Sequence, residues 1–175
     1  MALPDSVTQQ HAEQSRLLQP SVMTHHGMHT SDPVRIKEAQ TPEEVQQVLA
    51  IREAVFVAEQ GIPATLDQDG WDDASIHVLA FYQEAPAATG RMTGTTDREG
   101  VLARIAVLPA YRGRGLGKRV VRHLEELARR EGFTAVTLKP HHYLESFYRT
   151  LGYETVPGST TRAGSHALIT MTKTL

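Results

Sequence analysis

Alternating apolar and polar residues predict short strands along much of this chain. Residues 34–39 alternate in the manner of a half-buried strand. The same pattern, or a short apolar run bounded by turn residues, predicts further strands at residues 76–82, 87–93, 101–107, 133–139, 153–156 and 166–172. Residues 83–86 should join two of these strands as a hairpin. The stretch at residues 60–74 has neither period and is expected to be a loop.

Apolar residues at helical spacing predict three helices. Thr41 and Glu44 form the sequence pattern of a capping box, which predicts that the first helix begins there. The strongest helix is expected over residues 115–131, where one face is apolar and Gly132 follows. A short helix is expected over residues 143–150. Strands interspersed with helices indicate an α/β or α+β sheet protein.

Composition narrows the class of protein. The chain has 175 residues, of which 40% are hydrophobic and 22% charged, and a net charge of −2. It has no cysteine, which excludes disulfides, thiolate zinc sites and a cysteine nucleophile. A strong basic excess is absent, which disfavours nucleic acid as a partner. No apolar run is long enough for a membrane span and no secretory signal is visible, so we expect a cytoplasmic protein.

The first part of the chain differs from the rest. Residues 1–33 are rich in polar residues and have no regular hydrophobic period, so we expect a flexible tail there. One domain should follow over residues 34–175. His25, His26 and His29 lie close together in the tail, but nothing around them predicts a fixed ligand geometry, so no metal site is expected.

A glycine-rich turn, RGRGLGK at residues 112–118, lies between a predicted strand and the strongest helix. A helix N-terminus has unpaired N–H groups and the positive end of the helix dipole, and glycine lets an anion approach closely. The turn fits neither a Walker A loop nor the G-x-G-x-x-G spacing of dinucleotide-binding proteins. Arg112, Gly115 and Gly117 fit (Gln/Arg)-x-x-Gly-x-(Gly/Ala), the pyrophosphate loop of acetyl-CoA-dependent N-acetyltransferases. The alternative is a tight turn without a ligand.

With this turn the chain resembles the GNAT superfamily of N-acetyltransferases over residues 34–175. Residues 105–117, IAVLPAYRGRGLG, look like the fourth strand and cofactor loop of the family. Residues 147–153, FYRTLGY, look like its later helix and strand. Residues 52–63 are similar to the ElaA/YjcF-like subgroup, as are His77 and the Gly164-Ser165-His166 run near the end.

The resemblance implies a mixed, twisted, mostly antiparallel sheet flanked by helices. Its fourth and fifth strands, here residues 102–107 and 133–139, would splay apart around the pantetheine arm. Backbone N–H groups of the loop would bind the pyrophosphate, and the Val107 amide would hold the thioester carbonyl. The implied cofactor-binding residues are Ile105, Ala106, Val107, Arg112, Gly113, Arg114, Gly115, Leu116, Gly117 and Lys118. The chain departs from the family at Pro140-His141-His142, where many relatives have Asn or Ala-Gln.

Acetyl transfer to an amine needs a base for the amine and a proton donor for the thiolate that leaves. Tyr148 is the predicted acid, because it lies where the family's acid usually lies and a phenol has a pKa of about 10. The alternative is a core aromatic residue on an amphipathic helix. The base is left open among Glu59, His77, His166 and a chain of water molecules.

Charge is distributed unevenly, with acids concentrated over residues 38–100 and cations over residues 101–131. This distribution suits a cationic amine and a polyanionic cofactor, or it is ordinary surface charge. The acidic run at residues 67–73 lacks the spacing of a calcium loop, so we expect a solvated loop near the substrate entrance.

These observations predict an N-acetyltransferase that moves an acetyl group from acetyl-CoA to a primary amine in a ternary complex. The acceptor would be a small-molecule or peptidyl amine, with no metal, nucleic acid or membrane involved. The sequence leaves open whether the protein forms a homodimer. The alternative function is a non-catalytic acyl-CoA-binding regulatory module on the same fold, since a fold alone does not determine activity.

Overall fold

The computed structural model describes residues 32–95 and 97–175. The predicted tail and its three histidines lie outside these residues, apart from Asp32 and Pro33. The described strands are β1 (Val34–Glu38), β2 (Ser75–Tyr82), β3 (Ala85–Gly94), β4 (Glu99–Val107), β5 (Ala135–Leu138), β6 (Glu154–Thr155), β7 (Thr161–Ala163), β8 (His166–Leu168) and β9 (Met171–Thr174). The α-helices are α2 (Pro42–Arg52), α3 (Ala64–Asp67), α4 (Leu116–Arg130) and α5 (Glu145–Thr150). The chain also forms a π-helix, η1 (Glu53–Glu59), and three short 3₁₀ helices among the described residues, η2 (Asp72–Ala74), η3 (Pro109–Tyr111) and η4 (His142–Leu144).

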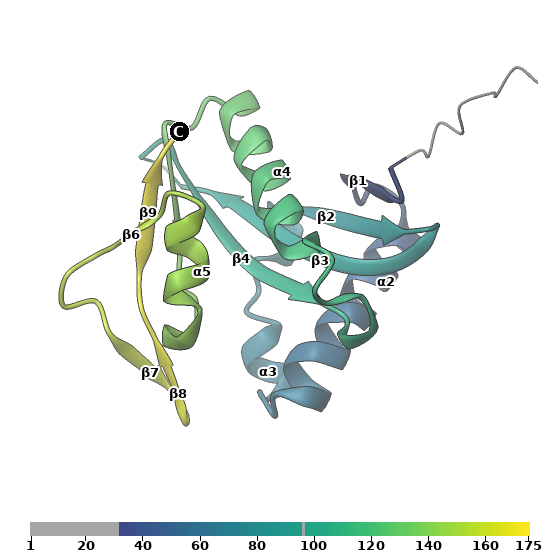
Figure 1. Cartoon of the computed structure of the whole chain (residues 1–175), viewed down its shortest axis with the longest axis horizontal. Helices are drawn as coiled ribbons and strands as arrows, with labels where there is room; N and C mark the ends of the chain where they lie inside the picture. The colour runs from purple at the N-terminus through teal and green to yellow at the C-terminus, as the bar shows by residue number, and fades with distance from the viewer. Residues whose placement is uncertain (1–31, 96) are drawn as a thin grey trace, which may run out of the picture. The chain divides into compact units, whose positions relative to one another are not determined.

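One seven-stranded sheet carries the fold, in the order β1-β2-β3-β4-β5-β9-β6. All its strand pairs are antiparallel except β4 with β5. Residues of α4 and α5 pack into the larger core cluster on one face, and α2 packs into the smaller cluster on the opposite face (Figure 1). The predicted mixed, mostly antiparallel sheet with flanking helices is confirmed.

Local sequence signals account for several boundaries. Thr41 accepts a hydrogen bond from the Glu44 N–H and Glu44 accepts one from the Thr41 N–H, so the predicted capping box is confirmed. The hairpin between β2 and β3 is shorter than predicted. Its turn is Gln83 and Glu84 alone, both with positive φ (47° and 66°), which matches the twist of the flanking strands.

The β7–β8 hairpin and α3 differ from the sequence prediction. Residues 166–172, predicted as one strand, are divided between β8 and β9. β8 pairs with β7, which the sequence did not predict, while β9 pairs with β5 and β6. The predicted loop at residues 60–74 contains α3 and η2. Such short elements depend on tertiary contacts rather than on their own helix propensity.

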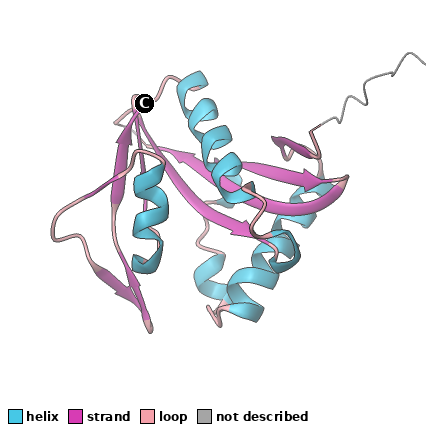
Figure 2. Ribbon diagram, viewed as in Figure 1, coloured by secondary structure: helices cyan, strands magenta, loops and turns pink. Residues whose placement is uncertain are grey.

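β4 and β5 diverge in the middle of the sheet. β5 pairs only with Glu99–Leu102, the first part of β4, while β4 continues to Val107 (Figure 2). On its other side β4 bulges, because Thr89 pairs with Ala106 but Arg91 pairs with Ala103. A Cβ at Gly90, opposite the bulge, would come within 2.8 Å of side chains on α4. The bulge and the splay together open the sheet beside α5.

No helix within residues 32–95 and 97–175 is long and apolar enough to cross a membrane.

Candidate active site

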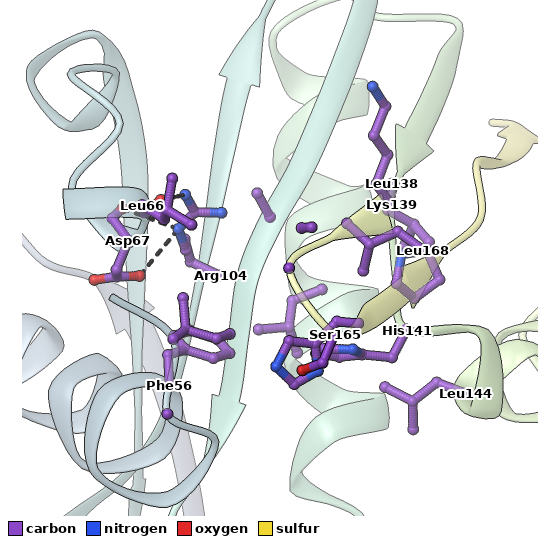
Figure 3. A pocket seen from close by; sticks show the side chains of 18 of the residues that line it. Phe56, Leu66, Asp67, Arg104, Leu138, Lys139, His141, Leu144, Ser165 and Leu168 are labelled. Atoms are coloured by element: carbon purple, nitrogen blue, oxygen red, sulfur yellow. Dashed lines mark hydrogen bonds and ion pairs between the residues drawn. The ribbon is translucent and has the colours of Figure 1, made fainter. Parts of the chain in front are cut away.

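A pocket of about 470 Å³ opens where β4 departs from β5 (Figure 3). Its walls come from β4 at residues 102–105, the end of β5 and the residues after it (138–141), the stretch from η1 to α3, and the β7–β8 turn. Phe56 lies on the opposite side of the pocket from Leu144 and Leu168. Most of the lining is apolar. Its polar side chains are Asp67, Arg104, Lys139, His141, Tyr148, Ser165 and His166.

A buried arginine on α2 holds one wall of the pocket. Arg52 is 0% exposed and donates to the Asp67 carboxylate at 3.1 Å and to the Asp67 carbonyl at 2.8 Å. It also donates to the Asp72 carboxylate at 2.7 Å. Because both acceptors lie in the segment after η1, these bonds fasten α3 and η2 to the helix beneath the sheet.

Two arginines from the sheet complete this network. Arg91 on β3 donates to Asp69 at 2.6 Å and to Asp72 at 2.8 Å, and Arg104 on β4 donates to Asp69 at 3.0 Å. Arg104 also pairs with Asp67 at 3.1 Å, as Figure 3 shows. The hydrogen bonds from Arg91 hold the pKa of Asp69 well below its usual range.

The network corrects one prediction. Asp67, Asp69 and Asp72 supply three of the four carboxylates in the acidic run, and three guanidinium groups neutralise them. Residues 68–71 and 73 are exposed, as expected of a solvated loop, but three of the four carboxylates are paired with arginines and are not free to attract a cationic amine.

Tyr148 lies on α5 and lines the pocket. Its ring packs edge-on against Phe147 and Tyr153, with centroids 5.0 and 5.7 Å away. Within the described parts of the chain, no hydrogen bond involves its hydroxyl. Burial raises the pKa of Tyr148 well above its ordinary value, so the phenol stays protonated at neutral pH. A protonated hydroxyl without an internal partner is able to donate to a group in the pocket.

Two histidines meet in the same pocket. His166, at the start of β8, lies edge-on to His141 with ring centroids 4.9 Å apart. Burial and the neighbouring His166 lower the pKa of His141 below 6.5. Sequence reasoning selected His166 but not His141. The departure from the family pattern at residues 140–142 is the sequence signal that marks His141, although that signal alone does not identify a general base.

The other two predicted bases do not line the pocket. Glu59 receives hydrogen bonds from both terminal nitrogens of Arg112, at 2.8 and 2.7 Å, and these bonds lower its pKa. His77 is 8% exposed, and its Nε2 lies 3.0 Å from the Asp72 carbonyl, where it supports η2. A paired carboxylate and a buried structural imidazole are both poorly placed to receive a proton from a molecule in the pocket.

The glycine-rich turn forms the N-terminus of α4, as predicted. Gly113 and Gly115 both have φ 75°, and a Cβ at either would meet open space, so backbone conformation rather than crowding favours glycine. Leu116 is 1% exposed, so its side chain belongs to the core. The side chain of Lys118 is exposed. Arg114 lies over the Tyr82 ring at 4.8 Å from its centroid.

The end of β4 presents backbone groups toward the gap that β5 leaves. The Leu108 N–H donates to the Ala87 carbonyl, so Ala88 and Val107 are a non-hydrogen-bonded pair and the Val107 peptide groups point away from β3. Arg112 Nε donates to the Val107 carbonyl at 3.0 Å. Ala106 instead packs into the core cluster beside α2. The Val107 N–H is therefore directed away from β3, on the side where β5 no longer pairs with β4.

Among residues 32–95 and 97–175, no group of three or more His, Asp or Glu side chains is arranged to hold a metal ion.

The sequence pattern of the Acetyltransferase (GNAT) family matches residues 45–153. The chain belongs to this family. A protein of Bacillus subtilis (strain 168) that is named as an acetyltransferase is 34% identical over 125 residues, which cover 70% of this chain and 84% of the relative. The N-acetyltransferase YjcF of the same organism is 32% identical over 115 residues, which cover 66% of this chain and 81% of YjcF. These relatives identify the GNAT chain as an acyltransferase, as predicted.

Solved structures share the fold of this GNAT protein. Escherichia coli ElaA is 23% identical and superposes with a TM-score of 0.71 over 80% of this chain and 99% of ElaA. The likeness to ElaA and YjcF confirms the predicted resemblance to their subgroup. An aminoglycoside 6′-N-acetyltransferase, 16% identical, was solved as a complex with coenzyme A and has a TM-score of 0.66 over 80% of this chain and 96% of its own. GNAT proteins bind acetyl-CoA.

Proposed function

We propose that this GNAT protein transfers the acetyl group of acetyl-CoA to a primary amine held in the pocket. The observation that carries the proposal is the course of β4. The strand lines the pocket at residues 102–105, presents the Val107 N–H to the splay, and leads within a few residues to the glycine-rich loop. One continuous segment can therefore serve both the acyl end and the pyrophosphate end of an extended thioester.

The loop suits a pyrophosphate for two reasons. Gly113 and Gly115 hold left-handed conformations ahead of α4, so successive backbone N–H groups are brought to the positive end of that helix. The open space beside both glycines allows an anion to approach the backbone. Arg112, whose side chain is occupied by Glu59 and Val107, would contribute mainly by fixing the loop.

Acetyl-CoA supplies the activated acetyl group. In the proposed reaction the Val107 N–H donates to the thioester oxygen, where negative charge develops, and Tyr148 gives its hydroxyl proton to the sulfur. The apolar walls exclude water and so limit hydrolysis of the thioester.

Gly115→Val tests the loop. Valine at φ 75° is strongly disfavoured, so we expect the loop to change conformation and the affinity for CoA to fall at least about tenfold. Gly117→Ala is the matched control, because a Cβ there makes only ordinary contacts, 3.7 Å from Val107 and 3.8 Å from Phe147. Calorimetry with CoA measures both variants. Unchanged affinity in folded Gly115→Val would contradict this assignment.

The lining also favours a class of acceptor. Among the described residues that line the pocket, Asp67 is the one carboxylate, and Arg52 and Arg104 already neutralise it. A second ammonium group on the acceptor would find no free carboxylate there. We therefore propose an amine with one positive charge and an apolar body.

Hexylamine and cadaverine provide a matched pair for this proposal, since they differ mainly in a terminal methyl versus a second ammonium. We expect kcat/KM for hexylamine to be at least about tenfold higher, because burying an unpaired charge is costly. Release of free CoA is the measurement. Equal or better use of cadaverine would contradict the acceptor class, and absence of CoA release with a broad amine panel would favour the regulatory module.

A further inference from the structure

His141 lies where three separate parts of the chain meet beside the pocket. It follows β5, and its backbone pairs with Leu168 of β8 in an isolated antiparallel bridge. Its ring stacks on Tyr143 with centroids 5.1 Å apart and an interplanar angle of 14°. His166 packs against the ring edge-on at 4.9 Å. The imidazole is thus held in one orientation by its neighbours.

A hydrogen bond indicates which ring nitrogen is basic. His141 Nε2 lies 3.3 Å from Gln60 Oε1, at the end of η1. With Gln60 Oε1 assigned as the acceptor, the neutral ring carries its proton on Nε2 and donates it to Gln60. Nδ1 is then left with a free lone pair. The ring has the tautomer and the fixed position that a proton acceptor needs.

We propose that His141 is the general base that takes a proton from the acceptor amine. This assignment rests on the proposed function. One ammonium proton passes to Nδ1 and from there to solvent, which leaves a neutral amine. As the C–N bond forms and the C–S bond breaks, Tyr148 protonates the sulfur, and the second proton lost by the nitrogen restores the phenol. The products are an amide, a thiol and one proton in solution.

The surroundings keep this imidazole neutral. Burial lowers the pKa of His141 and the neighbouring His166 lowers it further, so the ring is unprotonated at pH 7 and able to accept. The ionisable groups that touch the ring or share the pocket with it are His166, Tyr143, Tyr148, Asp67, Arg104 and Lys139. Asp67 and Arg104 are paired with each other, so no carboxylate in the lining is free to stabilise the imidazolium in the resting enzyme.

His141→Gln is the direct test. Glutamine can still hydrogen-bond Gln60, but it does not titrate. With hexylamine at pH 7 we expect kcat/KM to fall by about 10²-fold, the lower end of general base catalysis, while CoA affinity is unchanged. The wild-type log kcat/KM should also fall on the acid side with a midpoint below 6.5, and this acid limb should be absent from the variant.

Two further measurements separate a base from a merely structural residue. Trifluoroethylamine is already neutral at pH 7, so His141→Gln should use it at close to the wild-type rate. His166→Asn should keep the acid limb and move it to higher pH, because it removes the neighbour that lowers the pKa of His141. Loss of the limb in His166→Asn and its persistence in His141→Gln would overturn the assignment in favour of His166.

The outcomes also separate this assignment from the proposed function. If the wild type acetylates hexylamine and folded His141→Gln does so at the same rate, the assignment alone fails. If the wild type binds CoA but transfers acetyl to no amine, the proposed function fails, and the base with it.

Discussion

Replacing Tyr148 with phenylalanine should lower kcat for acetyl transfer by about 10²-fold while leaving CoA affinity nearly unchanged. The substitution removes only the hydroxyl, which has no hydrogen-bond partner among the described residues. The edge-on contacts with Phe147 and Tyr153 remain, so packing should be preserved. Burial raises the pKa of this phenol, which makes it a weaker acid, and for that reason we expect the lower end of the usual range.

Tyr153→Phe is the matched control for this prediction. Tyr153 packs against Tyr148, but it does not line the pocket, and its hydroxyl donates to Glu125 at 2.9 Å. Its loss should reduce the free energy of unfolding by about 1–3 kcal/mol, since a buried carboxylate loses a partner, and should leave kcat near wild type. Steady-state kinetics with hexylamine compares the two variants. A kcat for Tyr148→Phe within about twofold of wild type would show that Tyr148 is a core aromatic residue.

Arg52→Met should be the most destabilising single substitution among the polar residues of the fold, at about 3–5 kcal/mol of unfolding free energy. Methionine fills much of the space of arginine but cannot donate. Asp67, which is 7% exposed, would lose the guanidinium at 3.1 Å, and Asp72 would lose its donor at 2.7 Å. Asp67 would keep Arg104 and Asp72 would keep Arg91, but the three carboxylates of the network would then share two guanidinium groups. The charge left uncompensated beside the buried Asp67 costs more than the pair contributes.

Arg35→Met is the control, because it breaks an ion pair of the same type at the surface. Arg35 and Glu84 have side chains that are 48% and 82% exposed, so the expected loss is about 0–1 kcal/mol. Urea denaturation of both variants measures the difference. Similar small losses would mean that the arginine network contributes little to stability and that α3 and η2 are held by other contacts.

The structure shows which of the predicted catalytic residues line the pocket, which the sequence could not show. Tyr148 and His166 come to the pocket from α5 and β8, whereas Glu59 and His77 are engaged elsewhere with Arg112 and Asp72. Which side chains share a cavity depends on strand register and on pairings between distant segments. Residue type alone carries no such information. The catalytic roles of all four residues stay predictions, and the Tyr148→Phe and His166→Asn variants address two of them.

Signals contained within a few neighbouring residues determined much of this protein from sequence alone. The capping box at Thr41, the apolar stripe of α4 and the glycine loop before it depend on contacts inside one turn or one helix, so they are visible without a fold. Family membership followed from the loop for the same reason. The loop's pattern is contiguous, and the chemistry of a helix N-terminus is local.

Only the tertiary structure decided what surrounds the substrate pocket. The segment predicted as a loop at residues 60–74 contains α3 and η2, and Arg52, Arg91 and Arg104 reach it from α2, β3 and β4. The last predicted strand became two because β8 pairs with β7 and β9 with β5 and β6. Each of these contacts joins segments far apart in the chain, and its energy depends on a geometry that no local pattern records.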